Sequence, residues 1–397
     1  MKKQISVGLA AVLTVMIAGT AACGVYVVCE NQFDQEKAQY MAYEKEYQKL
    51  GEVQQVVKDY FVGDYDPDQA LEGAVDGYIQ GLGDRWSYYL TKDEYAEYKV
   101  ESAGELVGIG VSASYDSDTE SLYIVDVYDD SPAEKAGMAP GDRITAVEGK
   151  SVSEAGYTQS VQAVRGEEGT SVQLTVEHSN GKTKKMTITR KKTSATIVRG
   201  RMLKNDVGYL KISSFDQTSD TQFDAELKKL VDQGAKALVF DVRNNPGGSA
   251  VCVANMLDTL LPEGKIITLE SKDGKDSFTL KSDAKEVDLP MAVLVNGNSY
   301  SAAEFFAADL QEYGKAVVVG EKTCGKGYAQ TPLELSDGSA LVLSNKKYYT
   351  SQHKNLAGVG ITPDKTVSLS EDKLSRFYML TDAEDDQLQA AVESVLK

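Results

Sequence analysis

Histidine, cysteine and tryptophan are scarce in this chain of 397 residues, and acidic residues outnumber basic ones. The two histidines, His178 and His353, argue against a histidine-based metal site or a histidine-containing catalytic triad. None of the four cysteines stands in the CxxC spacing of a zinc site. A net charge of -18 argues against the basic surface that nucleic acids require. We therefore expect neither a metal ion nor nucleic acid as a partner.

The later pair of cysteines, Cys252 and Cys324, leaves two alternatives open. An oxidising compartment would permit a disulfide bond between them. Two unpaired, mostly buried thiols are the simpler prediction.

The apolar stretch at the N-terminus, residues 5–28, carries no charge and follows Lys2 and Lys3. It is longer than the roughly 20 residues that a membrane-spanning helix needs. Because the positive flank should stay inside, we predict a signal anchor at residues 1–29. The other domains of this single-pass cell-membrane protein would then lie outside the cytoplasm. Cleavage to a secreted form or lipidation at Cys23 is the alternative, although Thr20 stands where the lipoprotein pattern expects leucine.

The two ends of the remaining chain are expected to be helical. Residues 30–99 alternate charged and apolar side chains with few helix breakers. A compact aromatic turn at 82–90 interrupts them, with Trp86 as a predicted packing anchor. The acidic tail, residues 371–397, is expected to close with a helix whose acidic side chains face solvent.

Residues 100–193 consist of short predicted strands and turns, and this region resembles a PDZ domain. The resemblance lies in the glycine loop around Ile109, in Ser131-Pro-Ala133 and in Gly141-Asp142. Successive N–H groups in such a loop can capture a C-terminal carboxylate while the peptide adds a strand to the sheet edge. The predicted peptide-binding residues are Val107, Gly108, Ile109, Gly110 and Val111.

Residues 194–370 alternate apolar strands with helices, which predicts a layered α/β core. A buried strand is predicted at 237–242, and the turn at 241–248 leads into a helix. Residues 291–310 repeat this strand–turn–helix plan. Further strands are predicted at 316–319, 339–344 and 348–350.

Ser301 stands where the second of these strands turns into its helix, at the sheet edge where open α/β folds build their sites. A serine with Glu304 three residues later is also the pattern of a plain helix cap. Lys326 follows in a glycine-rich loop, and burial can make its amine neutral and therefore a general base. Gln330, four residues further on, could orient the lysine.

The turn Pro246-Gly247-Gly248 presents backbone N–H groups at the end of the neighbouring strand. An oxyanion needs two such donors. We predict that Gly247 or Gly248 supplies one and that Ala302, the residue after the nucleophile, supplies the other. A turn without this role is the alternative.

Together these motifs resemble the carboxyl-terminal processing proteases, also called tail-specific proteases, which are serine peptidases with a PDZ domain. The resemblance covers nearly the whole chain after the apolar segment. Besides the PDZ-like region, its specific parts are Leu82-Gly-Asp84, Ser87-Tyr-Tyr-Leu90, Asp241-Val-Arg-Asn-Asn-Pro-Gly-Gly248, Asn298-Ser-Tyr-Ser-Ala-Ala-Glu304, Gly320-Glu-Lys-Thr-Cys-Gly-Lys-Gly327 and Gly358-Val-Gly-Ile-Thr-Pro-Asp364.

The resemblance implies a multi-domain α/β and β fold. A ClpP/crotonase-like α/β protease core at 194–370 would carry an inserted PDZ-like β-domain at 100–193 and helical N- and C-terminal segments. The family's nucleophile falls on Ser301, its general base on Lys326 and its orienting glutamine on Gln330. Such a dyad needs no metal and no cofactor. The expected substrates are proteins with flexible, apolar C-terminal tails.

The family also implies finer features. An arginine of the PDZ domain contacts the active site in relatives, and Arg165 is its expected counterpart here, with a surface arginine in a turn as the alternative. The terminal helical segments form a dimer in some relatives, which leaves a homodimer open for this chain. Tyr300 and Cys324 depart from the family, which usually has alanine and phenylalanine there, and the thiol near Lys326 suggests sensitivity to oxidation. The rival interpretation is a catalytically silent, membrane-anchored PDZ scaffold.

Overall fold

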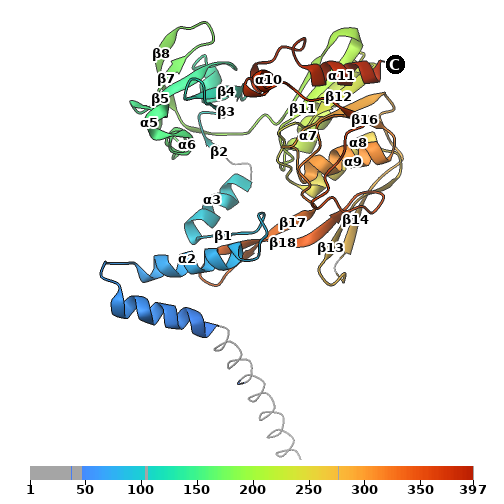
Figure 1. Ribbon diagram of the computed structural model, residues 1–397. Coiled ribbons are helices and arrows are strands. Elements are labelled where there is room, and N and C mark those ends of the chain that lie inside the picture. The colour runs from blue at the N-terminus through green and yellow to red at the C-terminus, as the bar shows by residue number, and fades with distance from the viewer. Residues whose placement is uncertain (1–36, 38–46, 103–105, 276, 397) are drawn as a thin grey trace, which may run out of the picture. The chain divides into compact units, whose positions relative to one another are not determined.

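The computed structural model describes residues 37, 47–102, 106–275 and 277–396 (Figure 1). The chain divides into two compact units, Met1–Gly73 and Ala74–Lys397. In the first unit, residues 47–60 are helical, and helix α2 (Pro67–Gln80) begins shortly after them. No helix in the described ranges has the length and apolarity that crossing a membrane requires. The predicted anchor at residues 1–29 lies outside these ranges.

A six-stranded sheet runs through residues 198–366 of the second unit, and its strands β11, β12 and β16 are labelled in Figure 1. Strand β10 is antiparallel to β11, and all other neighbours are parallel. Every residue of β12 and β15 is buried, as the apolar runs at 237–240 and 291–295 predict, and the burial of β12 includes Asp241 at its end. The strands, in sheet order, are β10 (Val198–Met202), β11 (Val207–Ile212), β12 (Ala237–Asp241), β15 (Met291–Val295), β16 (Ala316–Gly320) and β19 (Lys365–Thr366).

Helices cover both faces of this sheet and give three layers. On one face Leu238 and Phe240 of β12 pack with α7 (Ser219–Asp232), α8 (Ala250–Leu260) and α9 (Ala302–Glu312). On the other face Ala237 and Val239 pack with α11 (Asp386–Val395). The alternation follows the two-residue period of a strand. The predicted α/β core is therefore confirmed.

The tail contributes a buried ion pair as well as exposed acids. Arg243, in the turn after β12, donates to Asp241 Oδ2 at 2.6 Å and to Asp385 Oδ2 at 2.8 Å. All three side chains are less than a tenth exposed. The prediction that the tail's acids face solvent is thus wrong for Asp385, because a buried guanidinium needs carboxylate partners. This contact anchors the tail to the turn that follows β12.

A second sheet carries the segment that follows Lys326. Its order is β1-β18-β13-β14, and β17 also pairs with β18. The strands predicted separately at 339–344 and 348–350 are a single strand, because the lysines between them continue the pairing with β17 and β13. The elements are β1 (Tyr88–Leu90), β18 (Ala340–Tyr349), β13 (Gly264–Ser271), β14 (Ser277–Ser282) and β17 (Tyr328–Glu334), with α3 (Lys92–Ser102) after β1.

The PDZ region has its own sheet, in the order β3-β4-β5-β7-β8, and β3 is its edge strand. The predicted strand at 107–111 is interrupted at Ile109 and Gly110, because Gly110 has a positive φ of 80°. The elements are β2 (Leu106–Gly108), β3 (Val111–Asp116), β4 (Ser121–Val127), α4 (Pro132–Lys135), β5 (Arg143–Val147), β6 (Lys150–Ser151), α5 (Val152–Ala155), α6 (Tyr157–Val164), β7 (Ser171–Glu177), β8 (Thr183–Thr189) and β9 (Lys191–Thr193).

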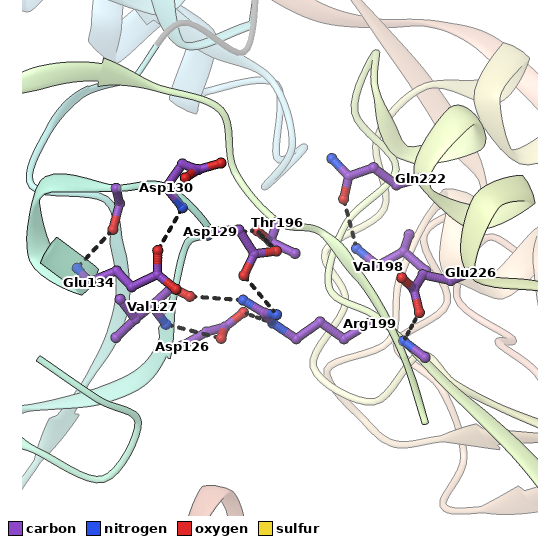
Figure 2. A network of polar contacts seen from close by, with 12 residues as sticks. Asp126, Val127, Asp129, Asp130, Glu134, Thr196, Val198, Arg199, Gln222 and Glu226 are labelled. Carbon is purple, nitrogen blue, oxygen red and sulfur yellow. Dashed lines mark hydrogen bonds and ion pairs between the residues drawn. The ribbon is translucent and has the colours of Figure 1, made fainter. Parts of the chain in front are cut away.

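Arg199 of β10 joins the core to the PDZ sheet (Figure 2). Its guanidinium donates to Asp126 Oδ2 at 2.7 Å and to the carbonyl oxygen of Val127 at 2.8 Å. Both partners lie at the end of β4, which pairs with the edge strand β3. The remaining short elements are η1 (Lys204–Asp206) in the core, and α10 (Glu371–Ser375) and η2 (Phe377–Met379) in the tail.

Candidate active site

Ser301 occupies a strained turn between β15 and α9. Its φ and ψ are 58° and -122°, a region that non-glycine residues rarely adopt, and its side chain is 5% exposed. The capping box that the sequence predicts is present between Ser301 and Glu304, but within the described ranges no helix N–H makes a cap hydrogen bond with the Ser301 hydroxyl. The Ser301 N–H donates to Glu304 Oε2 at 3.0 Å, whereas the Glu304 N–H donates to the main-chain oxygen of Ser301 at 2.9 Å. The Ser301 hydroxyl is therefore not needed to cap the helix.

Glu304 holds the nucleophile turn and the lysine loop together. Its carboxylate is fully buried. Oε1 accepts from the Thr323 hydroxyl at 2.6 Å and from the Gly325 N–H at 2.7 Å. Oε2 accepts from the N–H groups of Ser301 and Lys326, the latter at 2.8 Å. Burial raises the pKa of Glu304, and these four hydrogen bonds oppose that shift.

The two strand–turn–helix units are also joined directly at their turns. Asn296 Oδ1 accepts from the Asn244 N–H at 3.0 Å, and the Asn296 side chain donates to Asn244 Oδ1 at 2.9 Å. Ser299 donates to the carbonyl oxygen of Val242 at 2.7 Å. A Cβ added to Gly247 would lie 2.8 Å from Ser301 Cβ and 2.9 Å from the Ala302 nitrogen. The turn predicted to supply the oxyanion donors thus lies against Ser301.

The donors in this turn differ in what they already bind. The Gly247 N–H donates to Asn245 Oδ1 at 2.8 Å. Within the described ranges, the N–H groups of Gly248 and Ala302 have no hydrogen-bond acceptor in the protein. Of the predicted oxyanion donors, these two are the ones not already engaged by the described part of the protein, as an oxyanion requires.

Lys326 lies beside an aromatic pair rather than in a hydrogen bond with Ser301. Its Nζ is 4.5 Å from the centroid of the Trp86 ring and 5.9 Å from that of Tyr300. Among the residues described, no hydrogen bond links Lys326 Nζ to the Ser301 hydroxyl. Burial lowers the pKa of Lys326, and the charges of Asp84, Cys324 and Glu304 oppose that shift. The direction is the one that a general base requires.

Ser301 also has an aromatic neighbour on β18. Burial raises the pKa of Tyr348 to about 12, and a hydrogen bond with the Ser301 side chain opposes the rise. The Tyr348 hydroxyl therefore stays protonated at neutral pH.

Gln330 lies at a register shift in β17. Its side chain donates to Ser344 Oγ at 2.9 Å and to the carbonyl oxygen of Tyr328 at 3.0 Å. The Ser344 N–H in turn donates to Ser87 Oγ, and the Ser87 hydroxyl donates to Asp84 Oδ2 at 2.6 Å. Gln330 thus belongs to a chain of hydrogen bonds that ends at a carboxylate whose charge acts on Lys326.

The aromatic turn at 82–90 belongs to this site. The sequence predicted Trp86 only as a packing anchor and therefore missed this role. Trp86 contacts Lys326 and lies 5.4 Å from the Tyr300 ring. Arg85 donates to Cys324 Sγ at 2.8 Å. The available signal was Leu82-Gly-Asp84, one of the motifs on which the resemblance to the family rests. Cys252 and Cys324 are both free, so the prediction of unpaired thiols is confirmed.

The predicted peptide-binding loop lines a cavity of about 250 Å³ in the PDZ region. The cavity lies between β3 and α6, and Arg165 also lines it. In the part of the chain that the structure describes, the N–H groups of Ile109 and Gly110 have no protein acceptor. They are therefore available to a carboxylate.

A larger cavity, of about 760 Å³, begins at the far end of β3. Ser114 and Tyr115 of β3 line it together with Tyr300, the residue before the candidate nucleophile. Asn244 and Tyr378 lie on its other walls. The two cavities thus mark the two ends of β3, and the second reaches the turn that carries Ser301.

Three family models match this chain. They are Peptidase family S41 over residues 206–367, PDZ domain over 123–178, and Activating protease CtpB N-terminal domain over 12–94. A carboxyl-terminal-processing protease of Synechocystis sp. is 32% identical over 326 residues, which cover 81% of this chain and 75% of that protein. The chain belongs to peptidase family S41. The predicted resemblance to the carboxyl-terminal processing proteases of this family is therefore confirmed.

Other S41-type relatives are longer than this chain. A probable CtpA-like serine protease of Staphylococcus saprophyticus is 34% identical over 325 residues, covering 81% of this chain and 65% of the relative. A second probable CtpA-like serine protease, from Staphylococcus haemolyticus, is 36% identical over 302 residues, which cover 75% of this chain and 60% of that protein. The chain thus spans less than two thirds of the length of these two proteins.

Solved structures with the same fold include a putative S41 protease from Bacteroides fragilis. It superposes with a TM-score of 0.61 at 21% identity, and the match covers 85% of this chain and 93% of that one. A photosystem II D1 C-terminal processing protease matches with a TM-score of 0.50 at 23% identity, covering 85% and 91%. At these identities the likeness concerns the fold alone.

Proposed function

We propose that this S41 family member is a serine endopeptidase that captures protein C-terminal tails and cuts them with Ser301 as nucleophile and Lys326 as general base. The observation that carries the proposal is the turn before α9. It holds Ser301 in a strained backbone conformation against Gly247, and the N–H groups of the adjoining residues Gly248 and Ala302 have no acceptor in the described chain. A hydroxyl beside two unused donors is the arrangement that acyl transfer requires.

The reaction would proceed through an acyl-enzyme. Ser301 Oγ attacks the carbonyl carbon of the scissile bond while its proton passes to the neutral amine of Lys326. The N–H groups of Gly248 and Ala302 donate to the oxyanion. The C–N bond then breaks, and the Lys326 ammonium returns the proton to the leaving amine. Water releases the acyl group in a second cycle with the same base.

The edge strand of the PDZ region supports tail capture. A carboxylate bound to the N–H groups of Ile109 and Gly110 would place the preceding residues along β3. Six residues of β3 span about 20 Å. A tail of that length or longer would reach the second cavity at Tyr115 and continue to the turn beside Ser301. Arg165, which lines the groove, is the proposed sensor of an occupied groove.

Cleavage of tail peptides tests this function. We expect the wild-type chain to cut peptides with a free apolar C-terminus, and an amidated C-terminus to weaken capture because the carboxylate is lost. Ser301→Ala and Lys326→Ala should each abolish turnover while leaving peptide binding intact. Retained cutting in either variant would refute the dyad. Tails much shorter than β3 should bind but resist cutting.

A catalytically silent scaffold is the competing function, and the resting position of Lys326 on the Trp86 ring is the observation in its favour. It predicts that tails bind to the wild-type chain and that no peptide of any length is cut. The same assay therefore separates the two functions.

The location of the protein is also a proposal. We propose that residues 1–29 anchor the chain in the cell membrane with the PDZ and protease regions outside the cytoplasm. Fractionation should find the full chain in membranes and a chain without residues 1–29 in solution. Recovery of the shorter chain in membranes would refute the anchor. Sedimentation of the soluble form tests the proposed homodimer.

A further inference from the structure

The side chain of Lys326 rests on two aromatic rings that sequence reasoning did not connect. Its Nζ lies 4.5 Å from the Trp86 centroid and 5.9 Å from the Tyr300 centroid, both within the range of a cation–π contact. The two rings are neighbours, with centroids 5.4 Å apart and planes inclined at 37°. The lysine therefore faces an aromatic pair contributed by two segments more than 200 residues apart.

The aromatic pair is held in place by its own contacts. Trp86 lies in a turn in which its main-chain N–H donates to Asp84 Oδ1 at 3.1 Å. The guanidinium of Arg85 lies 4.3 Å from the centroid of the Trp86 ring. Tyr300 is the residue before Ser301, and its N–H donates to the carbonyl oxygen of Asn245 at 3.2 Å. The charged and titratable groups around the lysine are Asp84, Arg85, Tyr300, Glu304 and Cys324.

An ammonium and a neutral amine behave differently at such a site. The ring faces attract the ammonium, whereas the neutral amine gains little from them. Only the neutral amine can take a proton from Ser301. In the observed position Lys326 makes no hydrogen bond with Ser301, so the contact with the rings competes with its use as a base.

We propose that Trp86 and Tyr300 are positioning residues whose ring faces hold the protonated Lys326 side chain apart from Ser301, and that the side chain leaves them once it has lost its proton to water. This proposal deepens the proposed function and rests on it for the role of Lys326. The proton balance is simple, because the ammonium gives its proton to solvent before the cycle and the free amine then accepts the proton of Ser301 Oγ.

The chain offers a direct probe, because Trp86 is its only tryptophan. Growth on monofluorinated tryptophan would place a single fluorine label at this ring, and fluorine NMR of the full chain can follow it as the pH is raised. We expect a step in the chemical shift that Lys326 causes as it loses its proton, at a pH below the ordinary lysine pKa of 10.5. Lys326→Met should abolish the step, and Cys324→Ser should retain it. Persistence of the step in Lys326→Met would overturn the proposal.

Fluorination of the ring also tunes the contact without opening the site to water. More heavily fluorinated tryptophan has a weaker ring face at nearly the same size, so the step should move to lower pH. The expected change is about a twofold to fivefold loss of proton affinity. Tyr300→Phe, which keeps a ring face, should leave the step in place, whereas Tyr300→Ala should move it in the same direction as fluorination. A step that does not move, or that moves to higher pH, would refute an attraction between the rings and the ammonium.

Kinetics then link the contact to the reaction. In each variant, the acid limb of the plot of kcat/KM against pH should shift together with the NMR step. Where the step moves to lower pH, kcat/KM on the acid side should therefore rise by the same factor by which the proton affinity of Lys326 falls. A purely structural role of the rings would lower kcat/KM at every pH and leave the limb in place, which would refute the positioning role. If the wild-type chain cuts no peptide, the proposed function fails, while the NMR titration still decides where Lys326 rests.

Discussion

The two strand–turn–helix units of the core begin their helices in opposite ways. Ser249 starts α8 with φ and ψ of -71° and 121°, and its hydroxyl accepts from the Cys252 N–H at 3.3 Å. Ser301 starts α9 from a strained conformation and makes no such cap. At the second helix the Glu304 carboxylate accepts from the serine N–H instead.

This difference explains how the same residue type serves structure at one helix and chemistry at the other. The hydroxyl of an N-cap serine accepts a hydrogen bond from a backbone N–H in the first turn of the helix. Because Glu304 binds the Ser301 N–H and the first helix N–H groups of α9 donate to main-chain oxygens, the Ser301 hydroxyl remains for Tyr348 and for a substrate. The price is dependence on one buried carboxylate, which the first helix does not need.

The largest effect is expected from Glu304→Gln, which replaces one oxygen of this buried carboxylate by an NH₂ group. The amide can still accept at one oxygen, but its NH₂ group would face the N–H groups of Ser301 and Lys326. Two buried donors without an acceptor should cost about 3 kcal/mol in the free energy of unfolding. Displacement of both turns should lower kcat/KM about a hundredfold. Urea unfolding and peptide cleavage measure the two effects.

Glu312→Gln on the same helix is the matched control. Glu312 bonds to Ser351 and Gln352, away from the nucleophile turn. It should leave kcat/KM near the wild-type value. An equal loss of activity in both variants would show that α9 tolerates no lost carboxylate, and it would remove the special role assigned to Glu304.

The second expected effect comes from the contact between the two turns. Gly247→Ala would bring a Cβ to 2.7 Å from the Tyr300 carbonyl oxygen and 2.8 Å from Ser301 Cβ, at a φ of 88°. We expect a stability loss of about 2–3 kcal/mol from strain and overpacking. A shift of the nucleophile should lower kcat/KM about tenfold to a hundredfold.

Gly234→Ala separates strain from contact. Gly234 has a similar φ of 90°, but its added Cβ would meet no atom within 4 Å. It should lose about 1–2 kcal/mol of stability and keep its activity. If Gly247→Ala behaves in the same way, the two turns do not depend on each other for the position of Ser301.

The sequence allows the elements of these units to be predicted, but not the partners that finish the site. The apolar runs of β12 and β15 and the serine at the turn are local patterns, and local patterns predicted them correctly. The capping pattern identified Glu304 only as a cap, because its bonds to Thr323, Gly325 and Lys326 join segments that no helical period relates. The charge of Asp385 looked solvated for the same reason.

Trp86 shows the limit most clearly. Nothing in the residues around it predicts a lysine 240 positions later, since β1 brings the aromatic turn to the second sheet only through pairing with β18. The usable signal was its position between Leu82-Gly-Asp84 and Ser87-Tyr-Tyr-Leu90, two of the motifs that carry the resemblance to the family. A motif shared by a family of enzymes but assigned only to packing is a reason to look for contact with the active site.

The smallest effect is expected from Ser249→Ala, which removes the N-cap hydroxyl of α8 and leaves Ser301 unchanged. Removal of an N-cap hydroxyl costs about 1 kcal/mol, because the Cys252 N–H at the start of α8 loses its acceptor. Ser249 directly follows Gly248 in sequence. The variant therefore also tests whether the cap of α8 positions the Gly248 N–H. We expect the midpoint of urea unfolding to fall slightly and kcat/KM to stay unchanged, since the Ser249 N–H still donates to the Phe215 carbonyl oxygen at 2.6 Å and fixes the turn. A clear fall in kcat/KM with little loss of stability would mean that the cap of α8 positions the Gly248 donor, and the division between a structural serine and a chemical serine would then fail.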